Sequence, residues 1–208
     1  MRTHMRLALC AALAPGLAMI PSPAEAARTG HINLFGGMKS LDEDVWTPVD
    51  SQQELGLETS FGGSAWPVLI AVDYFHATDQ ADEGDLQLTG TTQEFAVGVR
   101  KVWARKRASP YLGGGANWID AEVKTDAPPP PPPPPGASFF PVPDPEGGTT
   151  SESDSAVGLW MGGGVFWRLG PYVNLGLSAR LSGAKVNIRN EDLQTGGLHA
   201  GVVLGFGW

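Results

Sequence analysis

The sequence has few of the features on which disulfide-rich domains, helical membrane proteins and helical bundles depend. Its 208 residues include a single cysteine, Cys10, so no disulfide can form within the chain. After residue 26, no segment approaches the run of about 18 apolar residues that a membrane-spanning helix needs. Helical spacing of apolar residues is nowhere sustained, and the 28 glycines would weaken any helix that contained them. These absences leave an all-β fold as the expectation.

Basic residues are also scarce. The chain has 14 Lys and Arg against 22 Asp and Glu, a formal net charge of −8. Binding to nucleic acid is therefore excluded as a function, because contact with phosphates requires a basic surface.

The N-terminal segment is typical of an export signal. Two arginines precede an apolar stretch, Leu7–Ile20, which is too short and too interrupted to span a bilayer. Ala24 and Ala26 then supply the small-x-small pattern that signal peptidase accepts. We expect residues 1–26 to be removed, together with the cysteine, and residues 27–208 to form one domain.

Eight later segments alternate apolar and polar residues, which is the period of a β-strand with one apolar face. The clearest is the last, in which Leu198, Ala200, Val202, Leu204, Phe206 and Trp208 share a face. The expected strands are His31–Ser40, Gln53–Phe61, Trp66–Thr78, Thr92–Trp103, Pro110–Lys124, Ser155–Arg168, Tyr172–Val186 and Gly196–Trp208. The pattern leaves the facing of the fifth and sixth strands open, although Asn117 is expected opposite to Leu112, Ala116 and Trp118.

The connections between these strands alternate in length. Short ones are Gly62–Ala65, Ala104–Ser109 and Leu169–Pro171; long ones are Leu41–Gln52, Asp79–Thr91, Thr125–Asp154 and Asn187–Thr195. This alternation predicts an antiparallel up-and-down barrel with turns at one end and loops at the other. The long connections hold most of the carboxylates, so we expect acidic loops exposed at the surface.

The third long connection, residues 125–154, is proline-rich. Pro128–Pro135 is a run of eight prolines, which would form a stiff polyproline II rod of roughly 25 Å. Such a rod would present Phe139 and Phe140 to an extracellular partner. The alternative is a low-complexity insertion that a surface loop tolerates.

Aromatic residues gather at the ends of the expected strands. The turn-side set is Trp66, Trp103, Tyr111, Trp167, Tyr172, Phe206 and Trp208; Tyr74, Trp118 and Trp160 fall toward the loops. Two such girdles are typical of a barrel that crosses a membrane. The sequence thus favours an eight-stranded antiparallel transmembrane β-barrel over a soluble barrel or sandwich.

The export signal, eight strands, alternating connections and terminal aromatic residue together resemble the small bacterial outer-membrane β-barrel family. That family includes the transmembrane domain of outer membrane protein A and the opacity-type porins. The resemblance implies an outer-membrane location, contact with outer-membrane lipids, and recognition of the C-terminal strand by the barrel assembly machinery. No family motif for catalysis, metal binding or a cofactor is present to carry over, and we expect none of these.

Several charged and amide side chains fall on the inward face of the expected strands. They are Glu54, Glu58, Asp73, Glu94, Arg100, Asn117, Asn174 and Arg180. An eight-stranded barrel is only wide enough for its own side chains, so these charges must pair. The pairs would either plug the lumen or form a narrow, gated pore.

Histidine-based catalysis has little support. Beyond the leader, only His31, His76 and His199 remain, and no serine follows His199 in the His-x-Ser arrangement of a lipid A deacylase. We therefore expect a non-enzymatic outer-membrane barrel, structural or contacting partners through its loops. The alternatives are a narrow channel for small solutes or ions and, from a third class, an enzyme that modifies lipid A.

Overall fold

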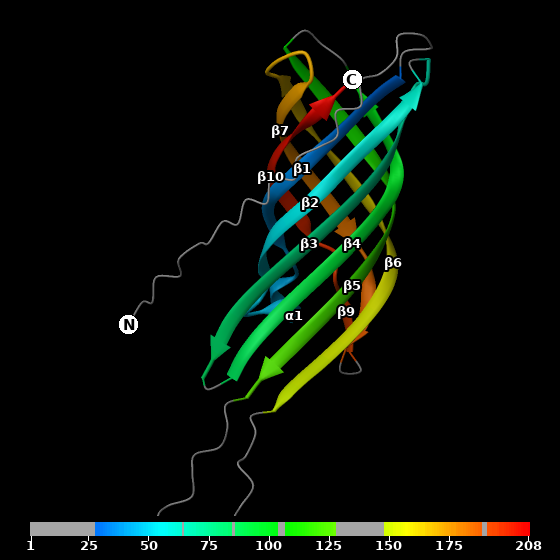
Figure 1. Ribbon diagram of the computed structural model, residues 1–208. Coiled ribbons are helices and arrows are strands. Elements are labelled where there is room, and N and C mark those ends of the chain that lie inside the picture. The colour runs from blue at the N-terminus through cyan, green and yellow to red at the C-terminus, as the bar shows by residue number, and fades with distance from the viewer. Residues whose placement is uncertain (1–27, 64, 85, 104–106, 128–147, 189–190) are drawn as a thin grey trace, which may run out of the picture.

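Eight long strands pair in a closed ring, and Figure 1 shows the barrel that they form. The computed structural model describes residues 28–63, 65–84, 86–103, 107–127, 148–188 and 191–208. The barrel strands are β1 (Arg28–Ser40), β2 (Ser51–Gly63), β3 (Leu69–Glu83), β4 (Leu86–Val102), β5 (Ala108–Asp126), β6 (Thr149–Arg168), β7 (Val173–Gly183) and β10 (Leu198–Gly207). Their order around the ring is β1-β10-β7-β6-β5-β4-β3-β2, and all neighbours are antiparallel. The predicted all-β, up-and-down barrel of eight strands is confirmed.

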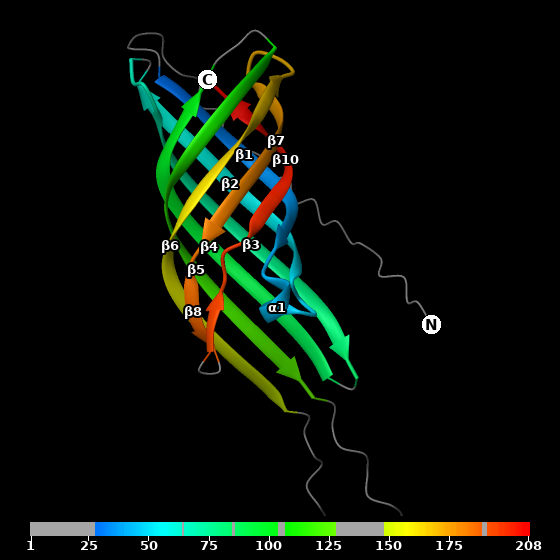
Figure 2. The ribbon, with the colours of Figure 1, turned by 180° about the vertical axis from the view of Figure 1, so that it is seen from behind.

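The sheet closes where its first strand meets its last. His31 lies opposite Gly207 and Ser40 lies opposite Leu198 in the β1–β10 pair. Just beyond this pair, the Gly30 and Trp208 backbones exchange two N–H···O bonds of 3.2 and 3.0 Å. The C-terminus therefore lies at the end of the barrel that carries the short turns, as Figure 2 shows.

Side chains alternate between the lumen and the outer surface. On β4, Glu94 is buried while its neighbour Phe95 is half exposed. The structure also settles the facing of β5 and β6, which the sequence left open. Asn117 and Trp160 point into the lumen, and Trp118 points outward.

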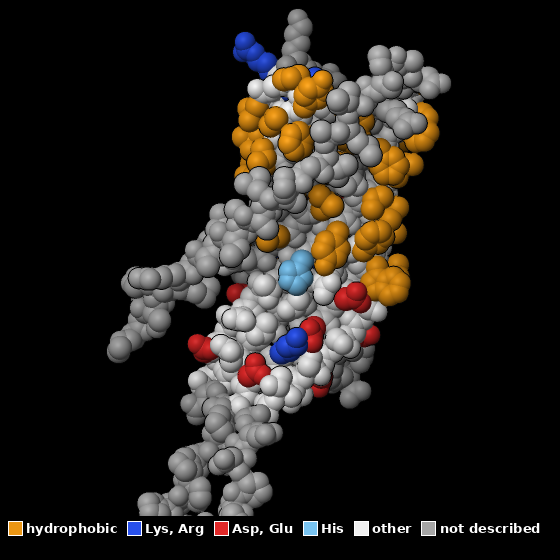
Figure 3. Space-filling view, in the orientation of Figure 1, with side chains coloured by type: hydrophobic (Ala, Val, Ile, Leu, Met, Phe, Trp, Pro, Cys, Tyr) orange, Lys and Arg blue, Asp and Glu red, His pale blue; other side chains and the backbone are white. Residues whose placement is uncertain are grey.

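The outer surface carries an apolar belt (Figure 3). Its loop-side edge on β3–β6 is one row of paired, exposed residues: Tyr74, Phe95, Trp118 and Val157. Two residues further along each strand, the outward row is polar: His76, Gln93, Asp120 and Ser155. On β6 the belt runs from Val157 to Trp167, a span of ten residue-to-residue steps. At about 3.4 Å per residue and a tilt of about 40°, this is a height of about 26 Å, close to the apolar band of membrane barrels.

Most of the predicted turn-side aromatic residues point outward on this belt. Trp66, Trp103, Trp167, Tyr172, Phe206 and Trp208 are 38–63% exposed. The prediction is wrong for Tyr111, which is 5% exposed and donates a hydrogen bond to Ser178 inside the barrel. Trp160, expected near the loop-side girdle, is also inside. Along their strands, both residues occupy the alternate positions whose side chains point into the lumen. This alternation decides on which side of the barrel a side chain lies.

The strands on one side of the barrel continue past the belt. The sequence predicts Asp79–Thr91 as a long loop, but Asp79–Glu83 instead ends β3 and pairs with the start of β4, with Asp79 opposite Gly90 and Glu83 opposite Leu86. Gly84 in the turn has φ of +65°, a left-handed conformation that favours glycine. Outward side chains here, such as Gln80, Asp82 and Gln87, are polar and exposed, so strand pairing continues without the apolar alternation that marks a strand in the belt.

The first connection folds back over the loop-side mouth of the barrel. It contains the single turn α1 (Glu43–Trp46), and Leu41, Trp46 and Val49 are buried. These three side chains pack with Ala121 of β5. The Trp46 indole donates to the Gln194 carbonyl, 2.9 Å away. We call residues 41–50 the mouth cap; its acidic side chains Asp42, Glu43 and Asp44 are exposed as predicted, and Asp50 is half-buried.

The last long connection also has structure of its own. β8 (Lys185–Ile188) and β9 (Glu191–Gln194) pair as a short hairpin within the segment that joins β7 to β10. Among the described residues, no helix has the length and hydropathy needed to cross a membrane. The expected export signal, residues 1–26, and the proline run, Pro128–Pro135, lie outside the described residues.

Candidate functional site

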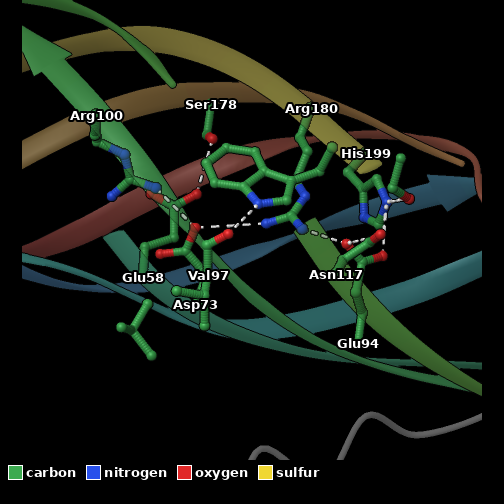
Figure 4. Close-up of polar contacts among 12 residues, drawn as sticks. Glu58, Asp73, Glu94, Val97, Arg100, Asn117, Ser178, Arg180 and His199 are labelled. Carbon is green, nitrogen blue, oxygen red and sulfur yellow. Dashed lines mark hydrogen bonds and ion pairs between the residues drawn. The ribbon is translucent and has the colours of Figure 1, made fainter. Parts of the chain in front are cut away.

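Within the described residues, the polar side chains that are shielded from solvent gather in the lumen of the barrel. The structure puts all eight predicted lumenal residues there, each at most 5% exposed: Glu54, Glu58, Asp73, Glu94, Arg100, Asn117, Asn174 and Arg180. Alternation on β2, β3, β4, β5 and β7 brings them to the inner face. Figure 4 shows most of them converging on Arg180 from different strands.

Arg180 of β7 connects the charged groups across the lumen. Its guanidinium pairs with Asp73 of β3 at 3.4 Å and forms a close ion pair with Glu94 of β4. Asp73 in turn accepts from Arg100 at 2.9 Å. The four side chains form one chain of alternating charge, and such pairing offsets the cost of burying each charge.

Aromatic rings complete the surroundings of both arginines. The Arg180 guanidinium carbon lies 4.8 Å from the centre of the Phe75 ring and 4.4 Å from that of Trp160. Arg100 lies 5.3 Å from the centre of the Tyr111 ring. Cation–π contacts of this kind strengthen when water is excluded, so the rings favour arginine over a smaller cation at position 180.

A second group of polar contacts lies toward the loop end. Lys39 of β1, which is 1% exposed, donates to Thr92 at 3.1 Å, and Thr92 donates to Gln52 at 2.8 Å. The Lys39 ammonium is also 3.9 Å from Glu94, whose other oxygen accepts from Asn117 at 3.0 Å. Glu94 is thus shared between the Arg180 chain and this loop-side group.

His199 contacts Glu54 and Ser182 in the lumen, and the three side chains have the Ser–His–Glu order of a catalytic triad. Its Nδ1 is 2.8 Å from a Glu54 oxygen, and its Nε2 is 2.9 Å from the Ser182 hydroxyl. Each residue comes from a different strand, so sequence proximity gave no sign of this Ser–His–Glu arrangement.

The surroundings of Ser182 do not suit a nucleophile. The residue is 4% exposed, and the nearby Gly197 N–H, a candidate oxyanion donor, points at the serine hydroxyl itself at 3.4 Å. A nucleophile needs an open approach for substrate and free donors for the developing oxyanion. The arrangement instead ties β7, β10 and β2 together beneath the mouth cap.

The turn-side part of the lumen is filled by stacked rings. His31 stacks on Phe166 with centroids 5.4 Å apart, and Phe166 stacks on Tyr111 at 4.4 Å. The Tyr111 hydroxyl donates to Ser178 at 2.8 Å, and Ser178 donates to Glu58 at 2.9 Å. Rings and paired charges together fill the interior over the described strands.

Sequence reasoning omitted Lys39, Ser182 and Tyr111 from the lumenal set. Parity could have found each of them. Lys39 alternates with apolar Met38 on β1, Ser182 follows Arg180 by two residues, and Tyr111 shares the parity of Asn117. No group of three or more His, Cys, Asp or Glu side chains in the described ranges is arranged to hold a metal ion.

No protein-family model matches the sequence, and comparison with curated proteins gives no match. Solved structures do match. A major outer membrane protein of Thermus thermophilus is 11% identical with a TM-score of 0.51, over 88% of this chain and 98% of that one. Ail, the attachment invasion locus protein of Yersinia pestis, solved with the heparin analogue sucrose octasulfate, is 14% identical with a TM-score of 0.50, over 87% of this chain and 99% of its own. The chain therefore has the fold of small bacterial outer-membrane β-barrels.

Proposed function

We propose that this protein is a non-enzymatic outer-membrane barrel whose lumen is plugged and whose loop-side surface faces the medium. The observation that carries the proposal is an apolar belt about 26 Å high on the outside of the barrel, together with an interior in which buried charges pair with each other. A belt of that height fits a bilayer, and an interior occupied by paired charges and stacked rings fits a structural or contact role.

The plug is favoured over the narrow channel by the contacts of Arg180. Passage of an ion along the lumen requires this guanidinium to leave Asp73, Glu94 and both of its ring contacts at once. Leaving a buried charge without its partner costs about 3–5 kcal/mol when the partner is removed by mutation. The mouth cap adds a second obstruction at the loop end.

The assembly steps and partners are part of the same proposal. Residues 1–26 direct export and are removed, outer-membrane lipids surround the belt, and the assembly machinery recognises the C-terminal strand that ends at Trp208. An extracellular partner binds through the proline-rich connection between β5 and β6, which is shorter than the expected 125–154 because the strands include residues 125–126 and 149–154. The exposed acidic residues of the mouth cap disfavour a sulfated sugar such as the one held by Ail, because like charges repel.

Fractionation and bilayer recordings test this proposal. We expect the protein to be recovered in the outer-membrane fraction, to migrate differently on gels before and after heating, and to carry no current in planar bilayers. Recordings from an open porin under the same conditions provide the control. Steady conductance by the purified barrel contradicts the plug, and recovery in a soluble fraction contradicts the membrane location. A change in lipid A acylation on deletion of the gene would support the enzyme alternative instead.

A further inference from the structure

A small cavity lies in the lumen next to the arginine chain. Its volume is about 10 Å³, and its polar lining comes from Glu58, Asp73, Arg100, Tyr111, Ser178 and Arg180. A buried site needs roughly 10–15 Å³ to hold one water molecule. The cavity therefore has room for one water and for nothing larger.

Several polar atoms of these residues are buried without a hydrogen-bond partner. They are Oε2 of Glu58, Nε and Nη1 of Arg100, and Nε of Arg180. The other polar atoms of the same side chains are engaged, since Glu58 Oε1 accepts from Ser178 and Arg100 Nη2 donates to Asp73. Unpaired buried polar atoms are rare in folded proteins, and ordered water is the usual partner where protein groups are out of reach.

Glu58 differs from the other lumenal carboxylates in its contacts. Glu54 contacts His199, Asp73 contacts both arginines, and Glu94 contacts Arg180. Within the described residues, Glu58 makes no ion pair and has one hydrogen bond, from Ser178. An unpaired carboxylate at this depth would be costly, so Glu58 is the group most in need of a further donor.

We propose that the cavity binds a single water molecule that bridges Glu58 and Arg100. The water donates to Glu58 Oε2 and accepts from Nη1 or Nε of Arg100. The lining carboxylates Glu58 and Asp73 balance Arg100 and Arg180 in charge, so an anion or a cation gains nothing from entering. A ligand that both donates and accepts fits the lining, and water does so at this size.

The bridge connects two hydrogen-bonded chains that are otherwise separate. One chain runs Tyr111–Ser178–Glu58, and the other runs through Arg100 and Asp73 to Arg180. The inference depends on the lumen alone, so it stands whether or not the barrel contacts an extracellular partner.

High-resolution diffraction from the mature barrel tests the site directly. We expect one density peak within hydrogen-bond distance of Glu58 and Arg100, with no anomalous signal after a bromide or caesium soak. An anomalous peak there shows an ion and overturns the proposal. A direct Glu58–Arg100 contact without a peak also overturns it.

NMR in detergent provides a second measurement that needs no variant. Magnetisation transfer from water to the Arg100 Nε–H should be seen, because the bridging water is held far longer than surface water. Its absence contradicts the proposal.

A matched pair of variants then tests whether Glu58 is the group to which the water donates. Glu58→Gln keeps an acceptor oxygen and should keep the transfer signal, while Glu58→Met has similar length without an acceptor and should lose most of it. An unchanged signal in Glu58→Met overturns Glu58 as the partner. If Glu58→Met does not fold, the diffraction peak and the wild-type signal still decide.

Discussion

Arg180 contacts two carboxylates and two aromatic rings inside the lumen. Its guanidinium reaches two carboxylates from different strands while lying between the rings of Phe75 and Trp160. Lysine provides the charge but neither the planar fork nor the stacking. The position therefore requires arginine for geometry as well as for charge.

We predict that Arg180→Ala lowers the free energy of unfolding by about 3–5 kcal/mol, because Asp73 and Glu94 would lose their shared cation in a dry site. Arg180→Lys should lose less, since it keeps one charge near both groups. Urea unfolding in detergent, followed by tryptophan fluorescence, measures the difference. Arg168, exposed at the turn end of β6, is the matched control, and Arg168→Ala should change the midpoint little. An unchanged midpoint in Arg180→Ala would show that the lumen does not depend on this charge.

A second residue-scale prediction concerns Ser182. Because the Ser182 hydroxyl is buried and already hydrogen-bonded, we expect no reaction with a fluorophosphonate probe. Ser182→Ala should lower the free energy of unfolding by about 1 kcal/mol, because the contact with His199 is lost. A known serine hydrolase labelled in the same gel is the positive control. Labelling of the wild type that disappears in Ser182→Ala would identify an active nucleophile.

At the scale of elements, the mouth cap separates the lumen from the medium. Trp46 and Val49 fill the loop-side mouth, and Thr92 lies below them, 1% exposed. We predict that a cysteine at Thr92→Cys reacts slowly with a water-soluble thiol reagent. Adding Trp46→Ala should raise the rate by at least about tenfold, because the cap loses its main buried side chain and opens more often.

The expected removal of Cys10 with the leader leaves no competing thiol in this experiment. Ser153→Cys, on the exposed outer face of β6, should react quickly with or without Trp46→Ala. Equal rates at Thr92→Cys with and without the cap mutation would show that the cap does not seal the mouth.

The proline-rich loop should be dispensable for folding. The chain ends that flank it already meet, since Ala127 N–H donates to the Gly148 carbonyl at 3.0 Å. Replacing residues 128–147 with Asn-Gly supplies a two-residue hairpin turn and reduces the loop-closure entropy. We expect a heat-modifiable barrel in normal amount, measured by gel shift and fractionation. Failure to insert would show that the loop takes part in assembly.

Sequence alternation predicted the elements only where lipid lies on one side and the lumen on the other. There, Phe95 and Glu94 differ in polarity because their surroundings differ. Past the belt this contrast ends, so Asp79–Thr91 shows no strand pattern in the sequence although Asp79–Glu83 pairs with Leu86–Gly90. The burial of Trp46 depends on β5 and β9, which are distant in sequence, and local pattern contains no information on that contact.

Part of the lumenal site could also be predicted from the alternation of residues along the strands. Parity placed Arg180 and Glu94 inside, but pairing partners depend on the stagger of strands around the ring, which alternation does not determine. His199 and Glu54 are 145 residues apart in the chain and 2.8 Å apart in the barrel. The position of Tyr111 near a strand end suggests the interfacial girdle, but its place in the strand alternation puts it in the lumen.

For the whole molecule, integrity depends on the seam where β1 meets β10. The seam continues past Gly207, because the Gly30 and Trp208 backbones bond to each other. The Trp208 ring also covers Gly30, and a Cβ at Gly30 would overlap the indole. Removing Phe206–Trp208 deletes both the pairing and this ring contact.

We therefore predict that deletion of Phe206–Trp208 leaves little heat-modifiable protein in the outer membrane, and that Gly30→Val reduces the amount to an intermediate level. The valine displaces the Trp208 ring but keeps the backbone pairing, which separates ring packing from strand pairing. Gly36 on the same strand is the matched control, because a Cβ there meets only Leu55 at 3.9 Å, and Gly36→Ala should assemble normally. Gel shift of membrane fractions measures all three variants. If the deletion assembles as well as Gly36→Ala, closure of the barrel does not need its last residues. If Gly30→Val assembles normally while the deletion does not, the seam depends on backbone pairing without the ring.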